Sequence, residues 1–151
     1  MSTWYITAMK ESDIDTVLEI ENSSFDSPWG LKSYQDELTC RDSYCYTVNL
    51  GNRKIIAFIC FRLFIDEMHL MKLAVTPALR GLGVALWTLE KCIYLSREAG
   101  ATIAYLEVRP SNNAGIELYK KLGFQIAGIR PGYFSDNMED ALIMVKKFKE
   151  E

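Results

Sequence analysis

The chain has 151 residues, of which 49% are apolar and 25% are charged, and its formal net charge is −3. This length is typical of one domain with one core, and no Gly-, Ser- or Pro-rich run indicates a linker. We therefore expect a single domain over residues 1–151. The pI near 5.3 argues against nucleic-acid binding through a broad basic face and weakly favours a cationic partner such as an amine.

Two features of the sequence bear on compartment and on metals. The first residues lack a basic segment followed by an apolar one, and the apolar run over residues 55–65 is too short for a bilayer and contains Arg62. These features predict a cytoplasmic protein that does not bind membranes. The four cysteines have irregular spacings and no C-x-x-C pair, so neither a disulfide framework nor a metal site is predicted.

The first half of the chain shows strand and helix patterns in turn. Residues 3–8 alternate like a strand, and Ser12 with Asp15 is typical of a capping box at the start of a helix. The pattern then predicts a short helix with Leu31, Tyr34 and Leu38 on one face, strands over residues 43–50 and 54–65 around a Gly51-Asn52 turn, and a strand over residues 68–75.

The second half of the chain predicts the remaining elements. These are a helix over residues 84–99, a strand over 102–108, a helix capped at 111–113 and ending at 122, and strands over 124–129 and 141–147. The order βααβββαβαββ is typical of an α+β protein in which helices pack against a mixed sheet. No repeat or heptad is visible, which argues against solenoids and coiled coils. The function must therefore come from particular residues grouped at a binding or catalytic site, and not from a repeating architecture.

A glycine-containing segment before the long helix predicts an anion site. In R-G-L-G-V-A, residues 80–85, small residues let a ligand approach the helix N-terminus, where unpaired N–H groups and the helix dipole attract anions. Arg80 adds a donor suited to phosphate. An ordinary strand-to-helix turn would have the same appearance. A dinucleotide site would need G-x-G-x-x-G early in a βαβ unit, and the third glycine is missing here.

The spacing R-x-x-G-x-A in this segment resembles the coenzyme A pyrophosphate loop of the GNAT acetyltransferases. Two further runs are L-E-V-R-P-S-N-N-A-G-I-E-L-Y-K-K-L-G-F at residues 106–124 and G-Y-F-S-D-N-M-E-D-A-L-I-M at residues 132–144. Both resemble the RimI-type ribosomal-protein alanine N-acetyltransferases and the archaeal N-terminal (N-alpha) acetyltransferases. The resemblance covers most of the chain. It implies the GNAT fold, a three-layer α/β arrangement in which a mixed seven-stranded sheet carries helices on both faces.

The resemblance also implies how acetyl-CoA, the expected cosubstrate, is held, and it implies no metal. The pantetheine arm would pair with the backbone of the strand that ends in Leu73, Ala74 and Val75. Asn112 would hydrogen-bond the cofactor, and Tyr119 would lie beside its sulfur. The pyrophosphate would lie against Arg80, Gly81, Leu82, Gly83, Val84, Ala85 and Leu86.

Acetyl transfer to an amine requires a base, because much of an α-amine with a pKa of about 7.7–8 is protonated near neutral pH. Glu107 matches the family's general base and Tyr119 its general acid; the alternatives are a carboxylate paired with Arg109 and a tyrosine that only packs. His69 matches a residue that helps to hold a catalytic water in some archaeal relatives. It is a second candidate base, and a strand histidine with an ordinary hydrogen bond is the alternative.

The expected acceptor is the N-terminus of a polypeptide, such as a ribosomal protein. In related N-terminal acetyltransferases the peptide enters between the loop after the first helix and the final hairpin. Tyr133 and Phe134 match the aromatic pair that contacts the peptide backbone. Phe25, Pro28 and Trp29 match the loop that lines the pocket for the first residue, although packing under a loop is the alternative for these aromatic residues.

Two other functions stay open on the sequence alone. The enzyme could acetylate a small amine or a lysine side chain, against which Tyr133 and Phe134 argue. The chain could instead be a non-catalytic acetyl-CoA-binding regulatory module, against which the intact Glu107 and Tyr119 argue. A partner subunit or a homodimer is compatible with the sequence, but no exposed helix pattern requires one.

Overall fold

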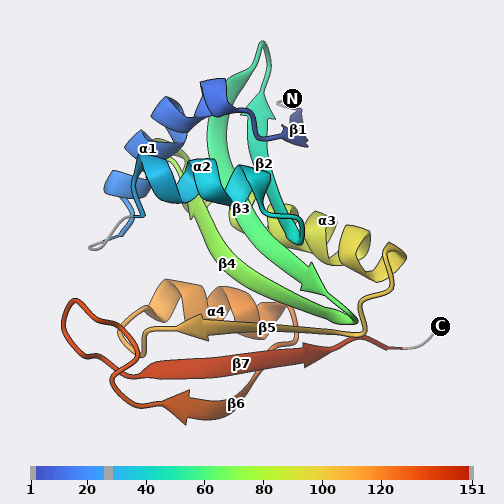
Figure 1. The fold of residues 1–151 in the computed structure, drawn as a ribbon, viewed down its shortest axis with the longest axis vertical. Coiled ribbons are helices and arrows are strands. Elements are labelled where there is room, and N and C mark those ends of the chain that lie inside the picture. Colours follow the sequence, from blue (N-terminus) through green and yellow to red (C-terminus); the bar gives the residue numbers. More distant parts are fainter. Residues whose placement is uncertain (1–2, 26–28, 150–151) are drawn as a thin grey trace.

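The protein is described by a computed structural model over residues 3–25 and 29–149 (Figure 1). Its helices and strands follow the predicted order. They are β1 (Trp4–Ala8), α1 (Ile14–Asn22), α2 (Leu31–Thr39), β2 (Ser43–Leu50), β3 (Lys54–Phe64), β4 (Glu67–Val75), α3 (Val84–Glu98), β5 (Ile103–Val108), α4 (Asn113–Lys121), β6 (Gln125–Arg130) and β7 (Ala141–Lys147).

The strands form one seven-stranded sheet in the order β1-β2-β3-β4-β5-β7-β6. β4 and β5 pair in parallel, whereas each other neighbouring pair is antiparallel. A parallel pair needs a crossover connection, and α3 supplies it between β4 and β5. The predicted mixed sheet is confirmed.

Helices cover both faces of this sheet. Because side chains alternate along a strand, β3 directs Phe58 and Cys60 to one face and Ile59 and Phe61 to the other. The first pair packs with buried residues of α1 and α2, and the second with buried residues of α3 and partly buried residues of α4. Burying each large apolar side chain contributes about 1.5–3 kcal/mol, so the two faces form the main cores of a three-layer fold.

The start of α1 differs from the sequence prediction. A 3-10 turn over Glu11–Asp13 precedes the helix, and the Lys10 backbone N–H donates to Asp13 Oδ2 at 2.8 Å. Ser12 therefore lies inside this turn, and the predicted capping box of Ser12 and Asp15 is wrong. The extra turn brings Asp13, rather than Asp15, within reach of an unpaired backbone N–H.

The cysteines are free thiols. Cys45, Cys60 and Cys92 are buried and Cys40 is partly buried. Burial raises the pKa of Cys92 to about 12, which keeps it a protonated, unreactive thiol. None of the helices within the described ranges is long and apolar enough to cross a membrane.

β4 and β5 pair only near their starts, where Glu67–His69 lies beside Ile103–Tyr105. Beyond these residues the two strands diverge toward the side on which the β6–β7 loop lies (Figure 1). The β3–β4 ladder also shifts there, because Leu70 pairs with Phe61 and Lys72 with Cys60, so that Met71 is an extra residue. Such a bulge re-aims the side chains that follow it. Lys72 consequently shares a face of the sheet with His69.

Candidate active site

A cavity of about 560 Å³ occupies the gap between the diverging strands. It brings together residues from the α1–α2 loop, β4, β5, α4 and the β6–β7 loop. Among the predicted site residues, its lining includes Phe25, Trp29, Leu73, Glu107, Asn112, Tyr119, Tyr133 and Phe134. Pro28 lies outside the described residues.

The two candidate bases are hydrogen-bonded to each other. His69 Nε2 lies 2.7 Å from Glu107 Oε1, and the His69 ring stacks on Tyr105 with the ring centroids 4.2 Å apart. The Glu107 side chain is 8% exposed and that of His69 is 22% exposed. When Nε2 carries the proton it donates to the carboxylate, and Nδ1 is then an acceptor. The two groups therefore form one carboxylate–imidazole pair that can accept a proton.

Tyr133 contacts this pair from the β6–β7 loop. Its hydroxyl donates to Glu107 Oε1 over a long 3.4 Å, and its ring packs edge-on against Phe134 with the centroids 4.9 Å apart. Burial, and then the charge and the hydrogen bond of Glu107, raise the pKa of Tyr133 above its usual value. Tyr133 is therefore a neutral phenol that can donate to Glu107 or to a bound ligand.

Tyr119 reaches the cavity from the opposite face of the sheet. It lies on α4 and packs edge-on against Phe124, with the ring centroids 5.9 Å apart. Leu106 and Val108 point into the same core, so Glu107 between them points away from it. Burial raises the pKa of Tyr119 to about 12. The cavity thus carries a proton acceptor on one face and a protonated donor on the other.

The loop before α3 has a left-handed backbone at both of its glycines. Gly81 and Gly83 have φ values of 80° and 86°, a region that favours glycine. Gly83 is the N-cap of α3 and has no side chain with which to bind the first N–H groups of the helix. Arg80 donates from Nε to the Val75 carbonyl at 3.1 Å and from Nη2 to Ser24 Oγ at 2.8 Å. Arg80 therefore ties the loop to the residues that follow α1, and an anion at this loop would meet mainly the backbone N–H groups at the start of α3.

The second half of β4 offers an open strand edge to the cavity. Its residues pair with β3 on one side, whereas the described ladder with β5 stops at His69. Leu73 lines the cavity, and Ala74 and Val75 are buried. Asn112 lies across the gap and caps α4, because its Oδ1 accepts from the Gly115 N–H at 2.9 Å. An extended chain that carries amides could pair with this edge of β4.

A buried ion pair lies beside the aromatic wall formed by Phe25 and Trp29. Lys72 Nζ lies 2.8 Å from Glu21 Oε1, 4.1 Å from the centroid of the Phe25 ring and 5.1 Å from that of Trp29. Glu21 is fully buried, and its Oε1 also accepts from the Trp29 N–H at 2.6 Å. Neither Glu21 nor Lys72 was selected from the sequence. A glutamate on the buried face of α1 and a lysine within an apolar strand were the available signals.

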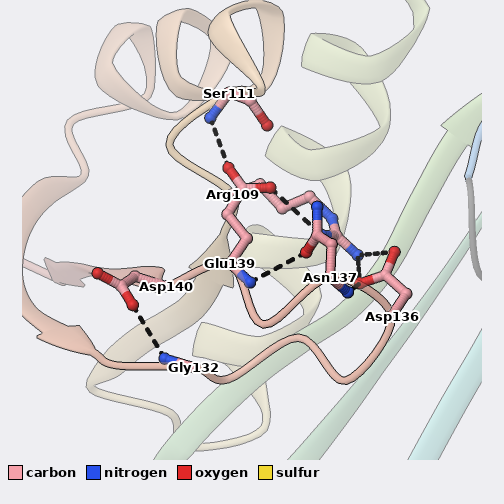
Figure 2. A network of polar contacts seen from close by, with 7 residues as sticks. All are labelled: Arg109, Ser111, Gly132, Asp136, Asn137, Glu139 and Asp140. Atoms are coloured by element: carbon pink, nitrogen blue, oxygen red, sulfur yellow. Dashed lines mark hydrogen bonds and ion pairs between the residues drawn. The ribbon is translucent and has the colours of Figure 1, made fainter.

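A second network that was missed in the sequence holds the β6–β7 loop to the end of β5 (Figure 2). Arg109 Nη2 lies 2.9 Å from each carboxylate oxygen of Asp136, and Nη1 lies 3.2 Å from Glu139 Oε1. The guanidinium carbon lies 4.0 Å from the centroid of the Phe134 ring. The far oxygen of Glu139 accepts from the Ser111 N–H at 3.2 Å. Arg109 thus holds the loop that carries Tyr133 and Phe134 beside the cavity, and does not pair with Glu107.

Replacing Arg109 with alanine should loosen this loop. Charge-assisted bidentate bonds are among the stronger polar contacts, and lysine cannot reproduce their planar geometry. We expect Arg109→Ala, and to a lesser degree Arg109→Lys, to raise the KM for the acceptor about tenfold while the KM for acetyl-CoA changes little. Steady-state kinetics with each substrate varied in turn would measure this. Arg41→Ala, at an exposed position before β2, is the control, and an unchanged acceptor KM in Arg109→Ala would contradict the role.

Comparison with known proteins gives the class of protein in which this site occurs. Residues 14–124 match the Acetyltransferase (GNAT) family, and the chain belongs to that family. It is therefore an acetyl-CoA-dependent N-acetyltransferase, as the resemblance in its sequence implied.

The relatives are more specific. A Bacillus subtilis protein provisionally named a ribosomal protein bS18-alanine N-acetyltransferase is 38% identical over 136 residues, which cover 90% of both chains. The crystal structure of the ribosomal-protein-S18-alanine N-acetyltransferase from Escherichia coli has a TM-score of 0.87 and 31% identity, and covers 100% of this chain and 96% of that one. Ard1 from Thermoplasma volcanium has a TM-score of 0.85 and 26% identity, with 97% and 99% covered. The predicted RimI-type and GNAT resemblance is confirmed.

Proposed function

We propose that the protein transfers the acetyl group of acetyl-CoA to the α-amine of a polypeptide. One observation carries the proposal: the aromatic pair Tyr133–Phe134 and the aromatic wall of Phe25 and Trp29 line the same cavity as Glu107. The bacterial relatives named for ribosomal protein bS18 support a ribosomal protein as the acceptor.

Acetyl-CoA would occupy the face of the sheet that carries α3 and α4. The open edge of β4 can hydrogen-bond the amides of pantetheine, and the N–H groups at the start of α3 can bind the pyrophosphate. The amide of Asn112 lies at the cavity and suits a cofactor carbonyl. This arrangement would bring the thioester to the gap between β4 and β5, beside Tyr119.

The acceptor would approach from the face that carries α1 and α2. The His69–Glu107 pair takes a proton from its ammonium group, directly or through a water, and passes it to solvent, and the free amine then attacks the thioester carbon. A nitrogen–carbon bond forms and the carbon–sulfur bond breaks, while Tyr119 donates a hydrogen bond to the sulfur as its charge develops. The pair takes the second proton, which the nitrogen loses on becoming an amide, and the thiolate takes up one proton from solvent. The products are an N-acetyl peptide and coenzyme A. Tyr133 would help to hold Glu107 and the peptide backbone in place.

A direct test is acetyl-CoA turnover by the purified protein against peptides with a free α-amine. Free lysine, a lysine peptide blocked at its N-terminus, and polyamines are the comparison substrates. Turnover confined to peptides with a free α-amine is the expected result. Turnover of small amines alone would overturn the proposed acceptor, and cofactor binding without turnover would overturn catalysis.

The pH dependence of kcat/KM follows from the proton donor and acceptor. The rate should rise as the peptide α-amine, with a pKa of about 7.7–8, loses its proton. It should then stay level to about pH 10, because burial raises the pKa of Tyr119 to about 12 and the phenol keeps its proton. A pH profile of kcat/KM on an alanine-first peptide measures this. A descending limb near neutral pH would show that another group is the donor.

A further inference from the structure

The cavity carries a negative group and a positive group at separate places, and acetyl transfer does not require the positive one. Glu107 and His69 lie on β5 and β4 near the point where the strands diverge. Lys72 lies three residues further along β4, on the same face because of the extra residue Met71. The proposed peptide site therefore has a carboxylate at the place of the α-amine and an ammonium group further along.

Lys72 is the member of the buried ion pair that faces the cavity. It lines the cavity together with Phe25 and Trp29, whereas Glu21 does not. The Lys72 side chain is 10% exposed and the Glu21 side chain 0%. A ligand between the two aromatic rings would consequently meet the ammonium first, with its counter-charge behind it. Coulomb interactions at a partly buried site are stronger than in water, so this order of charges affects binding.

We propose that Lys72 determines specificity, making the pocket for the first residue of the acceptor favour acidic and neutral side chains and reject basic ones. The inference rests on the proposed function, because it assumes a peptide N-terminus in the cavity. The α-ammonium of the acceptor would lie against Glu107, and a carboxylate on its first side chain would lie against the Lys72 ammonium. A lysine or arginine side chain would be repelled by Lys72 and would compete for the same aromatic rings.

The ratio of kcat/KM for two peptides that differ only in a first-position Glu or Lys tests this inference, because the ratio cancels losses of folded enzyme. The wild-type protein should prefer the Glu peptide. The double variant Glu21→Gln/Lys72→Met removes both charges together, which avoids an unpaired buried carboxylate, and should lower the ratio about tenfold. Lys72→Arg keeps the positive charge and should keep the preference. Lys54→Met, at an exposed position on β3, is the matched control and should leave the ratio unchanged.

The possible outcomes are distinct. An equal ratio in the wild-type protein and the double variant, with peptides still acetylated, would overturn the role of Lys72 and leave the proposed function standing. A wild-type preference for the Lys peptide would overturn it as well. If the wild-type protein acetylates no peptide, the proposed function fails and this inference fails with it.

Discussion

Glu107→Gln should lower kcat by about 10²- to 10⁴-fold, the usual contribution of a general base. The amide keeps the size of the side chain and can still bond to His69, but it cannot hold the negative charge that helps the pair to accept a proton. The KM for acetyl-CoA should change little, since the open edge of β4 and the loop before α3 are unaffected. Single-turnover kinetics on an alanine-first peptide would separate chemistry from binding.

The variant His69→Ala tests how His69 and Glu107 each contribute to accepting the proton. If the pair acts as a unit, His69→Ala and the double variant His69→Ala/Glu107→Gln should each lose about as much activity as Glu107→Gln alone. The reason is that effects within one unit are not additive. Glu67→Gln, at an exposed position at the start of β4, is the control for a lost carboxylate. Full activity in Glu107→Gln together with inactivity in His69→Ala would transfer the role of base to the histidine.

The sequence was sufficient for those features that depend on neighbouring residues. The element order, the glycine loop at residues 80–85, and the placement of Glu107 at a strand end and Tyr119 on a helix all follow from local patterns. The capping box failed because two acidic residues, Asp13 and Asp15, compete for the start of α1 and the sequence does not show which one reaches a free N–H.

Features that depend on distant pairings could not be predicted in the same way. His69 and Glu107 are 38 residues apart in sequence, and the sequence indicates them as two alternative bases. The parallel pairing of β4 with β5 brings them into contact, so that they form one pair. Lys72 and Glu21 are 51 residues apart. Their contact also depends on the bulge at Met71, which decides the face of the sheet on which Lys72 lies and which no local pattern indicates.

The largest effect on stability is expected from Lys72→Met. Methionine fills a similar volume and can pack against the Phe25 and Trp29 rings, so the main loss is the charge that balances Glu21. Removing one partner of a buried ion pair costs about 3–5 kcal/mol, because the other charge stays buried without compensation. For a chain of this length the melting temperature should fall by about 10 °C.

The double variant Glu21→Gln/Lys72→Met separates the ion pair from the packing around it. Replacing a whole buried pair by neutral groups of similar size is often nearly neutral, so most of the lost stability should return. Urea unfolding of the wild-type protein, Glu21→Gln, Lys72→Met and the double variant gives the coupling energy between the two residues directly. If Lys72→Met alone were as stable as the wild-type protein, Lys72 would not be the group that balances the Glu21 charge. Recovery in the double variant would show that the loss in Lys72→Met comes from the uncompensated charge of Glu21, and that the double variant is folded well enough to test specificity.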